Sequence, residues 1–118
     1  MTDHTHLVDR YIATWNETDP VRRDALLAAH WTEDARYADP MVTAEGRPHI
    51  GAVIGAVQKQ FPGFRFRLAG SADGHGNALR FSWTLGPDED PAMIRGTDFA
   101  RVDGGRLAAV TGFIDKLP

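Results

Sequence analysis

The sequence predicts an α+β domain in which helices pack against a mainly antiparallel sheet. Three observations predict it. Apolar residues recur at helical spacing in the first half of the chain, they alternate with polar residues in the second half, and glycine-containing turns separate the alternating segments. Runs of helices followed by runs of strands favour an α+β layer architecture. A curved sheet wrapped over helices would enclose a pocket.

Length, charge and composition narrow the class of protein further. The 118 residues should form one domain, residues 1–118, because domains commonly contain about 100–150 residues. A net charge of −3 offers no basic excess for a phosphate backbone, so we expect no nucleic-acid partner. No apolar run approaches the ~20 residues of a membrane helix, and no membrane partner is expected. The amino terminus lacks the basic and apolar regions of a signal peptide, which favours a cytoplasmic protein.

Two helices are predicted in the first third of the chain. The first presents one apolar stripe made of Leu7, Val8, Tyr11, Ile12 and Trp15. Asp19 is a typical N-cap and Pro20 a typical first helical residue. The second helix should therefore run from residue 21 to about residue 31 and bury Leu26, Leu27 and Trp31.

A short extended segment and a third helix should follow. The extended segment covers residues 35–38 and should end at Asp39, because a residue that precedes a proline avoids the helical region. The third helix should open at residues 46–48 and stop at the Pro-Gly pair of residues 62–63. Its apolar stripe is Ile50, Val53, Ile54, Val57 and Phe61.

Four long antiparallel strands are predicted in the second half. They cover about residues 64–68, 79–85, 93–102 and 107–114. The connections between them fall at residues 73–77, 86–91 and 103–105, which are rich in Gly, Asp and Pro.

Asp98 is the most informative anomaly in these strands. On the strand of residues 92–102 it shares a face with Ile94, Gly96, Ala100 and Val102. A carboxylate on an apolar face is costly unless it is paired, hydrogen-bonded or protonated. Asp98 is therefore either a structural group, paired with an arginine such as Arg80 or placed at an exposed strand end, or a protonated acid that donates to an oxyanion.

Tyr11 and Asp39 also carry alternative interpretations. The Tyr11 hydroxyl should point inward from the apolar stripe of the first helix and needs a partner, which any core acceptor could supply. Asp39 precedes Pro40 at the end of a short strand. It is either a residue of an ordinary Asp-Pro turn or a general base at the mouth of the pocket.

Other kinds of chemistry have little support in the sequence. There is no cysteine, so disulfides, thiolate zinc sites and a cysteine nucleophile are excluded. The five histidines lack metal-ligand spacing, and phosphate loops, nucleophile elbows and dinucleotide fingerprints are absent, so no metal and no cofactor are predicted. Aromatic residues are numerous enough to line an apolar cavity as well as to fill a core. The candidate contacts for a small apolar molecule are Trp15, Trp31, Ile54, Phe81, Trp83 and Phe113.

Five segments together resemble the SnoaL-like branch of the nuclear transport factor 2-like superfamily. They are residues 10–16 (RYIATWN), 31–35 (WTEDA), 37–40 (YADP), 46–50 (GRPHI) and 111–115 (TGFID). The resemblance covers nearly the whole chain and depends on the order and spacing of these segments. It implies a cone-shaped fold with three N-terminal helices packed in a curved, mainly antiparallel sheet around a deep pocket. The superfamily includes ketosteroid isomerases, polyketide cyclases, limonene epoxide hydrolases and dehydratases, so the fold alone does not settle function.

The resemblance to ketosteroid isomerases implies catalytic roles for three residues. Tyr11 matches the tyrosine that donates to the substrate oxyanion, Asp39 the general base before a proline, and Asp98 the protonated second donor. A supporting tyrosine of that family is replaced here by Ile54. Polyketide cyclases carry an acid/base aspartate at about the place of Asp98. The epoxide hydrolases need an Asp-Arg-Asp constellation that holds a water, and no arginine of this sequence can be assigned to that role.

Two functions follow as expectations. The first is a cofactor-free acid/base enzyme, similar to a ketosteroid isomerase or a polyketide cyclase, acting on an apolar carbonyl compound. The alternative is a non-catalytic module for small-ligand binding or dimerisation. Relatives often dimerise through the outer face of the sheet, so a homodimer is expected, and the face that carries Arg65, Arg67 and Arg80 would have to fit that contact.

Overall fold

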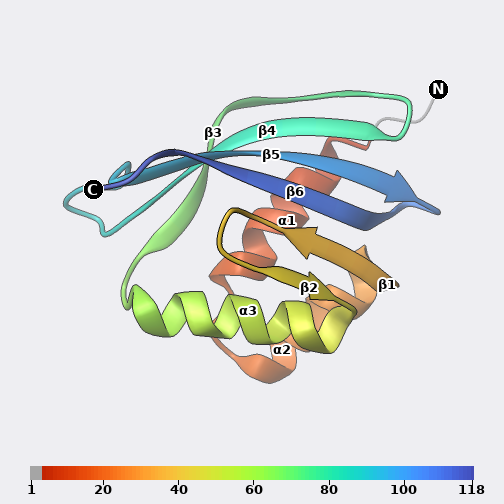
Figure 1. Ribbon diagram of the computed structural model, residues 1–118, viewed down its shortest axis with the longest axis horizontal. Coiled ribbons are helices and arrows are strands. Elements are labelled where there is room, and N and C mark those ends of the chain that lie inside the picture. Colours follow the sequence, from red (N-terminus) through yellow and green to blue (C-terminus); the bar gives the residue numbers. More distant parts are fainter. Residues whose placement is uncertain (1–3) are drawn as a thin grey trace.

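Helices α1 (His6–Asn16), α2 (Pro20–His30) and α3 (Arg47–Gln60) lie on one side of a six-stranded sheet (Figure 1). The computed structural model describes residues 4–118. Residues 1–3 lie outside the described residues. They are part of the amino-terminal segment on which the expectation of no signal peptide was based. None of the helices in the described part of the chain is long and apolar enough to cross a membrane.

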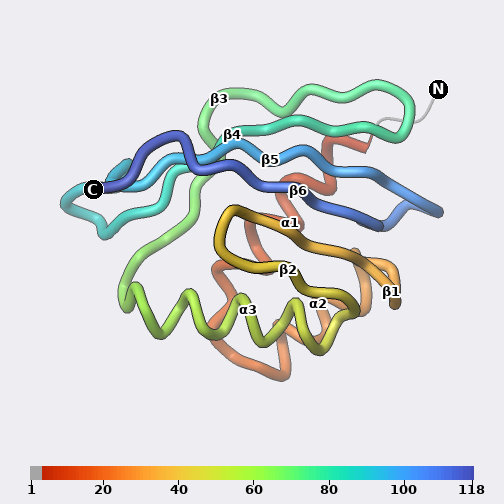
Figure 2. Tube along the Cα trace, viewed as in Figure 1, coloured from red at the N-terminus to blue at the C-terminus, as the bar shows by residue number. Residues whose placement is uncertain are grey.

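The sheet is mixed, with one parallel pair of strands. Its order is β2-β1-β6-β5-β4-β3, and only β1 and β6 run parallel. Figure 2 shows the β3–β4 and β5–β6 turns at one end of the sheet and the β4–β5 loop at the other. The strands are β1 (Trp31–Ala38), β2 (Thr43–Glu45), β3 (Arg65–His75), β4 (Ala78–Gly86), β5 (Ile94–Asp103) and β6 (Arg106–Lys116).

The predicted class and the antiparallel meander of the second half are confirmed. Only two of the three helices precede the first strand, because β1 and β2 lie between α2 and α3. The third helix has the predicted start and end: α3 begins after Gly46 and stops before Phe61.

The two amino-terminal helices form as predicted, with one change at the end of α2. The Asp19 carboxylate accepts the Val21 N–H, and Pro20 is the first helical residue. Leu26 is only half-buried. Trp31 is fully buried, but its backbone is extended (φ −122°, ψ 147°), so it opens β1 instead of ending the helix.

Tertiary pairing lengthens two strands beyond the sequence pattern. β1 starts at Trp31 because that residue pairs with Leu107 of β6. β3 continues to His75 through pairing with β4, which leaves only residues 76–77 as the turn where five residues were expected. The three-residue strand β2 was not predicted; it pairs with the end of β1. Pairing with a neighbour, rather than local alternation, defines these segments.

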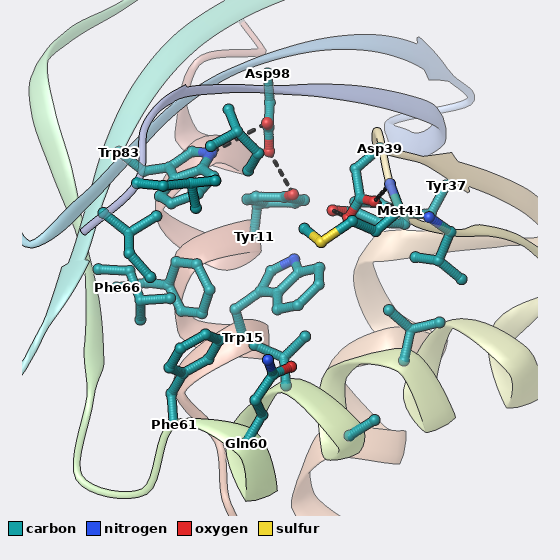
Figure 3. Close-up of a pocket in the computed structure, with 18 residues that line it drawn as sticks. Tyr11, Trp15, Tyr37, Asp39, Met41, Gln60, Phe61, Phe66, Trp83 and Asp98 are labelled. Carbon is teal, nitrogen blue, oxygen red and sulfur yellow. Dashed lines mark hydrogen bonds between the residues drawn. The ribbon is translucent and has the colours of Figure 1, made fainter.

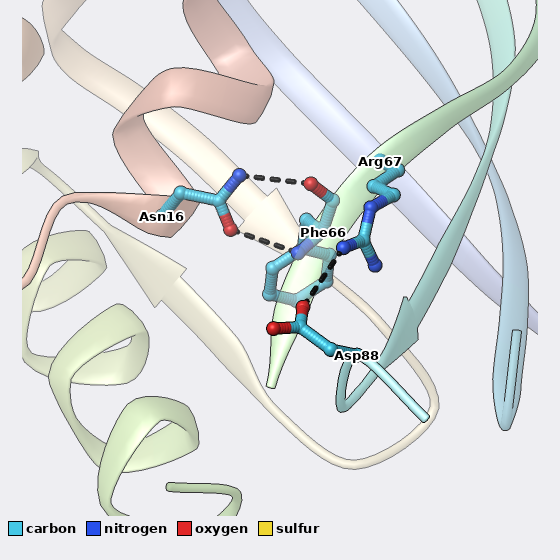
Figure 4. Close-up of polar contacts among 4 residues, drawn as sticks. All are labelled: Asn16, Phe66, Arg67 and Asp88. Carbon is cyan, nitrogen blue, oxygen red and sulfur yellow. Dashed lines mark hydrogen bonds and ion pairs between the residues drawn. The ribbon is translucent and has the colours of Figure 1, made fainter. Parts of the chain in front are cut away.

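Asn16 fastens the edge strand β3 to the end of α1. Its Nδ2 donates to the Phe66 carbonyl and its Oδ1 accepts the Phe66 N–H, both at 2.8 Å (Figure 4). Beside it, an exposed ion pair joins Arg67 to Asp88 at 3.2 Å. The two bonds from Asn16 satisfy outward-facing polar groups of an edge strand and fix the position of the Phe66 ring.

Candidate functional site

An apolar cavity of about 340 Å³ opens between the inner face of the sheet and helices α1 and α3 (Figure 3). This volume lies near the lower end of the range of about 300–1,000 Å³ for small-molecule sites. The residues with polar side-chain atoms that line it include Tyr11, Tyr37, Asp39, Gln60 and Asp98. The cavity therefore combines an apolar wall with a few groups capable of acid/base chemistry.

Asp98 faces the cavity from the middle of β5 and is 2% exposed. The Tyr11 hydroxyl donates to its Oδ2 at 2.5 Å, and the Trp83 indole Nε1 donates to its Oδ1 at 3.0 Å. Burial raises the pKa of Asp98 to about 6, although the two donors act in the opposite direction; the charges of Asp39 and Asp115 raise it further. Exclusion of water by an apolar ligand would favour the neutral acid still more.

Two glycines of the sheet make room for this hydrogen-bonded group. Trp83 pairs across the sheet with Gly96, and Asp98 with Gly112. A Cβ at Gly96 would lie 2.1 Å from Cζ2 of Trp83, and one at Gly112 would lie 2.8 Å from Oδ1 of Asp98. Neither glycine has a positive φ. Both positions therefore favour glycine because of space and not because of backbone conformation.

Asp39 lies just after β1, and its carboxylate is held by three donors. Oδ1 accepts the backbone N–H groups of Met41 and Val42 at 2.8 and 3.0 Å. Oδ2 accepts the hydroxyl of Tyr37 at 2.8 Å. A carboxylate oxygen has two lone pairs, so Oδ2 keeps one available for a proton.

Tyr37 is a site residue that the sequence analysis missed. It is 6% exposed, lines the cavity and bonds Asp39. Burial, followed by the bond to Asp39, raises its pKa well above the ordinary value, so the phenol stays protonated. The signal was present, because residues two apart in a strand point to the same face.

Tyr11 is fixed by aromatic contacts as well as by its hydroxyl. Its ring meets Phe81 edge-on at 5.0 Å and stacks on Trp31 at 5.6 Å. Burial, followed by the charge of Asp98, raises the pKa of Tyr11 well above the ordinary value. Tyr11 is therefore an oriented hydrogen-bond donor at neutral pH.

The structure brings Tyr11, Asp39 and Asp98 to the wall of one cavity. The alternative partner for Asp98 is wrong: Arg80 bonds Asp73 at 2.8 Å. The reason is strand alternation, because Phe81 is the residue directly opposite Asp98 and its neighbour Arg80 points to the other face.

The predicted apolar contacts divide into three groups. Trp15 and Trp83 line the cavity. Trp31, Ile54 and Phe81 do not; they are buried in the core behind it. Phe113 is also misplaced, since it is 51% exposed on the outer face of the sheet, where its ring meets Phe99 at 5.8 Å. It neighbours the inward-facing Gly112, so alternation turns it outward.

Most of the apolar wall was not singled out from the sequence. The apolar stripe of α3 contributes to two different places. Ile50 and Ile54 are buried in the core, whereas Val53 and Val57 line the cavity. Helical periodicity identifies the stripe but does not separate these two roles. The wall residues that sequence analysis did not name as contacts are Met41, Val42, Val53, Ala56, Val57, Gln60, Phe61, Phe66, Leu85, Ile94, Ile114 and Leu117.

No group of three or more His, Asp or Glu side chains within residues 4–118 is placed to hold a metal ion. The chemistry visible in the cavity belongs to two tyrosine–carboxylate pairs, Tyr11 with Asp98 and Tyr37 with Asp39. Their surroundings differ: Asp98 is desolvated, and Asp39 accepts backbone N–H groups. Carboxyl groups in different environments are typical of an acid and a base that share one site.

Comparisons with known proteins agree with this fold. A family model described as the SnoaL-like domain matches residues 8–110. A candidate isomerase of the SnoaL-like family from Agrobacterium tumefaciens superposes with a TM-score of 0.92 at 44% identity, covering 98% of this chain and 100% of that one. No curated protein matches the sequence.

Two more distant structures share the fold. A candidate ketosteroid isomerase from Kribbella flavida has a TM-score of 0.72 at 22% identity, covering 98% of this chain and 79% of that one. A candidate polyketide cyclase from Sinorhizobium meliloti has a TM-score of 0.72 at 14% identity, covering 91% of this chain and 93% of that one.

Proposed function

The chain belongs to the SnoaL-like domain family, and from this premise we propose that it is an acid/base enzyme that forms an enolate from a small apolar carbonyl compound. The observation that carries the proposal is that Tyr11, Asp39 and Asp98 line the same apolar cavity. The neighbouring structures named as candidate isomerases and a polyketide cyclase support the same class of chemistry.

The first step is a proton transfer to Asp39. Oδ2 of Asp39 takes a proton from the carbon next to the carbonyl, and the electron pair of that C–H bond moves onto the carbonyl oxygen. The backbone donors of residues 41 and 42 hold the carboxylate in place while it acts. The proton then returns from Asp39 to the same carbon or, in an isomerisation, to another carbon. In a cyclisation the enolate carbon attacks a second carbonyl, and the oxygen of that carbonyl takes up the proton from Asp39.

The second requirement is stabilisation of the enolate oxygen. With Asp98 neutral, its proton can be donated to the Tyr11 oxygen at the observed 2.5 Å, and the Tyr11 O–H is then free to point into the cavity. A fixed donor in a water-poor site stabilises developing charge more than water does. In this arrangement Tyr11 contacts the substrate, and Asp98 donates a hydrogen bond to the Tyr11 oxygen.

The direct test is hydrogen–deuterium exchange at the α-carbon of 2-tetralone in D₂O, which reports enolate formation whatever reaction follows. We expect the protein to accelerate exchange and Asp39→Asn to slow it by about 10²–10⁴-fold, the range of general-base catalysis. Asp88→Asn is the matched control, because Asp88 is exposed and does not line the cavity. Exchange at the rate of buffer, or undiminished in Asp39→Asn, would contradict the proposal.

The second candidate is a binding module without catalysis. Its support is that both carboxylates are already hydrogen-bonded within the protein and that the rest of the wall is mainly apolar. The fluorescence of the cavity residues Trp15 and Trp83 can report the binding of 2-tetralone. If 2-tetralone binds but its hydrogen exchange is not accelerated, the result favours the binding module.

We also propose that the outer face of the sheet joins two copies of the chain. Phe99 and Phe113 are 46% and 51% exposed there and contact each other. Arg80 and Arg67 are already paired with Asp73 and Asp88, so their charges are offset within one chain. Large exposed apolar groups favour an interaction surface.

Sedimentation velocity tests the assembly. Replacing Phe99 and Phe113 by Glu should convert a dimer to a monomer. The matched control is Val21→Glu, which changes an apolar residue that is 76% exposed on α2 and should leave the assembly intact. A wild-type monomer would rule the interface out.

A further inference from the structure

The indole N–H of Trp15 is a buried donor with no hydrogen-bond acceptor. Trp15 is 4% exposed and contributes to the cavity wall. In the described part of the chain, the other buried side-chain atoms without a partner belong to Arg23, Trp31, Thr32 and Arg67, none of which lines the cavity. A donor left unsatisfied in a site is costly in the free protein, so its position calls for a functional explanation.

The unsatisfied donor is directed at Tyr11. Trp15 follows Tyr11 by one helical turn, so the two side chains share a face of α1. Their ring centroids are 6.2 Å apart, and in Figure 3 the indole nitrogen points toward the Tyr11 hydroxyl. In this structure the indole N–H makes no hydrogen bond to that oxygen. It nevertheless favours the ionised phenol, against the larger effect of burial, which raises the pKa of Tyr11.

The hydrogen-bonding capacity of a phenol shows what the donor could serve. The oxygen has one proton to give and two lone pairs. When Asp98 is neutral and Tyr11 serves a ligand oxygen, the phenol proton goes to the ligand and one lone pair accepts the Asp98 proton. The second lone pair remains available for another donor, and the Trp15 indole nitrogen faces the Tyr11 oxygen (Figure 3).

We propose that Trp15 is a positioning residue whose Nε1–H closes onto the Tyr11 oxygen when Tyr11 donates to a ligand oxygen. The inference rests on the proposed role of Tyr11 and adds a group that the sequence analysis treated only as an apolar contact. No covalent bond is made or broken in this step. The indole supplies a fixed dipole at the Tyr11 oxygen, whose partial negative charge grows as its hydrogen is shared with the ligand oxygen.

Trp31 provides a matched comparison within the same molecule. Its indole N–H is also buried without a partner, and its ring also packs on Tyr11, but it does not line the cavity. Trp31→Phe and Trp15→Phe therefore remove the same chemical group from the same aromatic cluster. Only the second removes the donor aimed at the Tyr11 oxygen.

The experiment follows the indole N–H signals by ¹⁵N-resolved NMR while 2-naphthol is added to the whole chain. The sequence contains three tryptophans, and single Trp→Phe variants assign their signals. We expect 2-naphthol to move the Trp15 signal downfield and to leave the Trp31 signal unmoved. Naphthalene, which has no oxygen, should not produce the downfield shift.

Affinity gives the second readout. Trp15→Phe should weaken 2-naphthol binding about fivefold, the loss typical of one hydrogen bond between neutral groups, with little change for naphthalene. Trp31→Phe should preserve the preference for 2-naphthol. Binding of 2-naphthol with an unmoved Trp15 signal, or an unchanged preference in Trp15→Phe, would overturn this inference and leave the proposed enzyme standing. If 2-naphthol moves the Trp15 signal but exchange of 2-tetralone does not need Asp39, the proposed enzyme is contradicted and Trp15 remains a ligand-binding residue.

Discussion

The Tyr11 hydroxyl donates a 2.5 Å hydrogen bond to Oδ2 of Asp98, and these residues are separated by 87 positions in the chain. The bond joins α1 to the middle of β5 and lies in the wall of the cavity. Hydrogen bonds to an ionised partner are shorter and stronger than neutral ones. The protonation of Asp98 therefore couples the stability of the fold to the chemistry of the site.

The buried carboxyl of Asp98 should make stability depend on pH. Burial is the main reason that its pKa rises from 3.8 to about 6. The folded protein thus binds this proton more tightly than the unfolded chain does. The resulting contribution is fully present below pH ~4 and is lost as the pH rises through about 6, a change of about 3 kcal/mol at ~1.4 kcal/mol per pH unit.

Urea unfolding of the wild type and Asp98→Asn between about pH 3.5 and 7.5 measures this effect. The free energy of unfolding of the wild type, minus that of the variant, should fall by about 3 kcal/mol over the range. Asp88→Asn, at an exposed position, should follow the wild type. Parallel curves for wild type and Asp98→Asn would show that Asp98 titrates alike in both states.

Removal of the Tyr11 hydroxyl should raise the pKa of Asp98 above about 6. The bond from Tyr11 favours the ionised carboxylate and so lowers this pKa. Carboxyl ¹³C NMR of Asp98 in Tyr11→Phe measures the change. Tyr37→Phe is the matched control, since it removes a buried phenol hydroxyl that bonds Asp39 and not Asp98; a lower or unchanged pKa in Tyr11→Phe would refute the prediction.

A methyl group at Gly112 should displace the carboxyl of Asp98. The added Cβ would lie 2.8 Å from Oδ1, the atom that accepts the Trp83 indole N–H. We expect Gly112→Ala to lower the free energy of unfolding by about 1–3 kcal/mol, the range for overpacked sites. In an Asp98→Ala background the same change should cost less, and a double-mutant cycle by urea unfolding measures that difference. Strict additivity would mean that the clash lies elsewhere.

The Asn16–Phe66 hydrogen bonds and the Arg67–Asp88 ion pair of Figure 4 should differ in their effect on stability. Asn16→Ala leaves two backbone groups of Phe66 without a partner and should cost about 1–3 kcal/mol. Asp88→Ala breaks only an exposed ion pair with Arg67 and should cost less than about 1 kcal/mol. Thermal or urea unfolding of both variants measures the two losses in the free energy of unfolding. Equal losses would show that the Asn16 hydrogen bonds do not stabilise the position of β3.

The fold was largely predictable because local pattern and tertiary structure agree over most of the chain. The stripe of α1, the Asp19 cap and the alternation in β4 and β5 each follow from residues within one element. The strand β2 and the long ends of β1 and β3 did not follow. The backbone groups of these segments are satisfied by neighbouring strands and not by local pattern: β2 pairs with β1, β1 with β6, and β3 with β4.

The sequence by itself placed Tyr11 and Asp98 on apolar faces and Asp39 at the end of the first strand, because periodicity and proline geometry are local properties. Only the tertiary structure decided that Tyr11 bonds Asp98, that Tyr37 bonds Asp39, and that Phe113 faces outward. Contacts between distant segments depend on strand register and helix packing. A sequence pattern specifies a face, whereas the partner on that face is set by which element is packed against it.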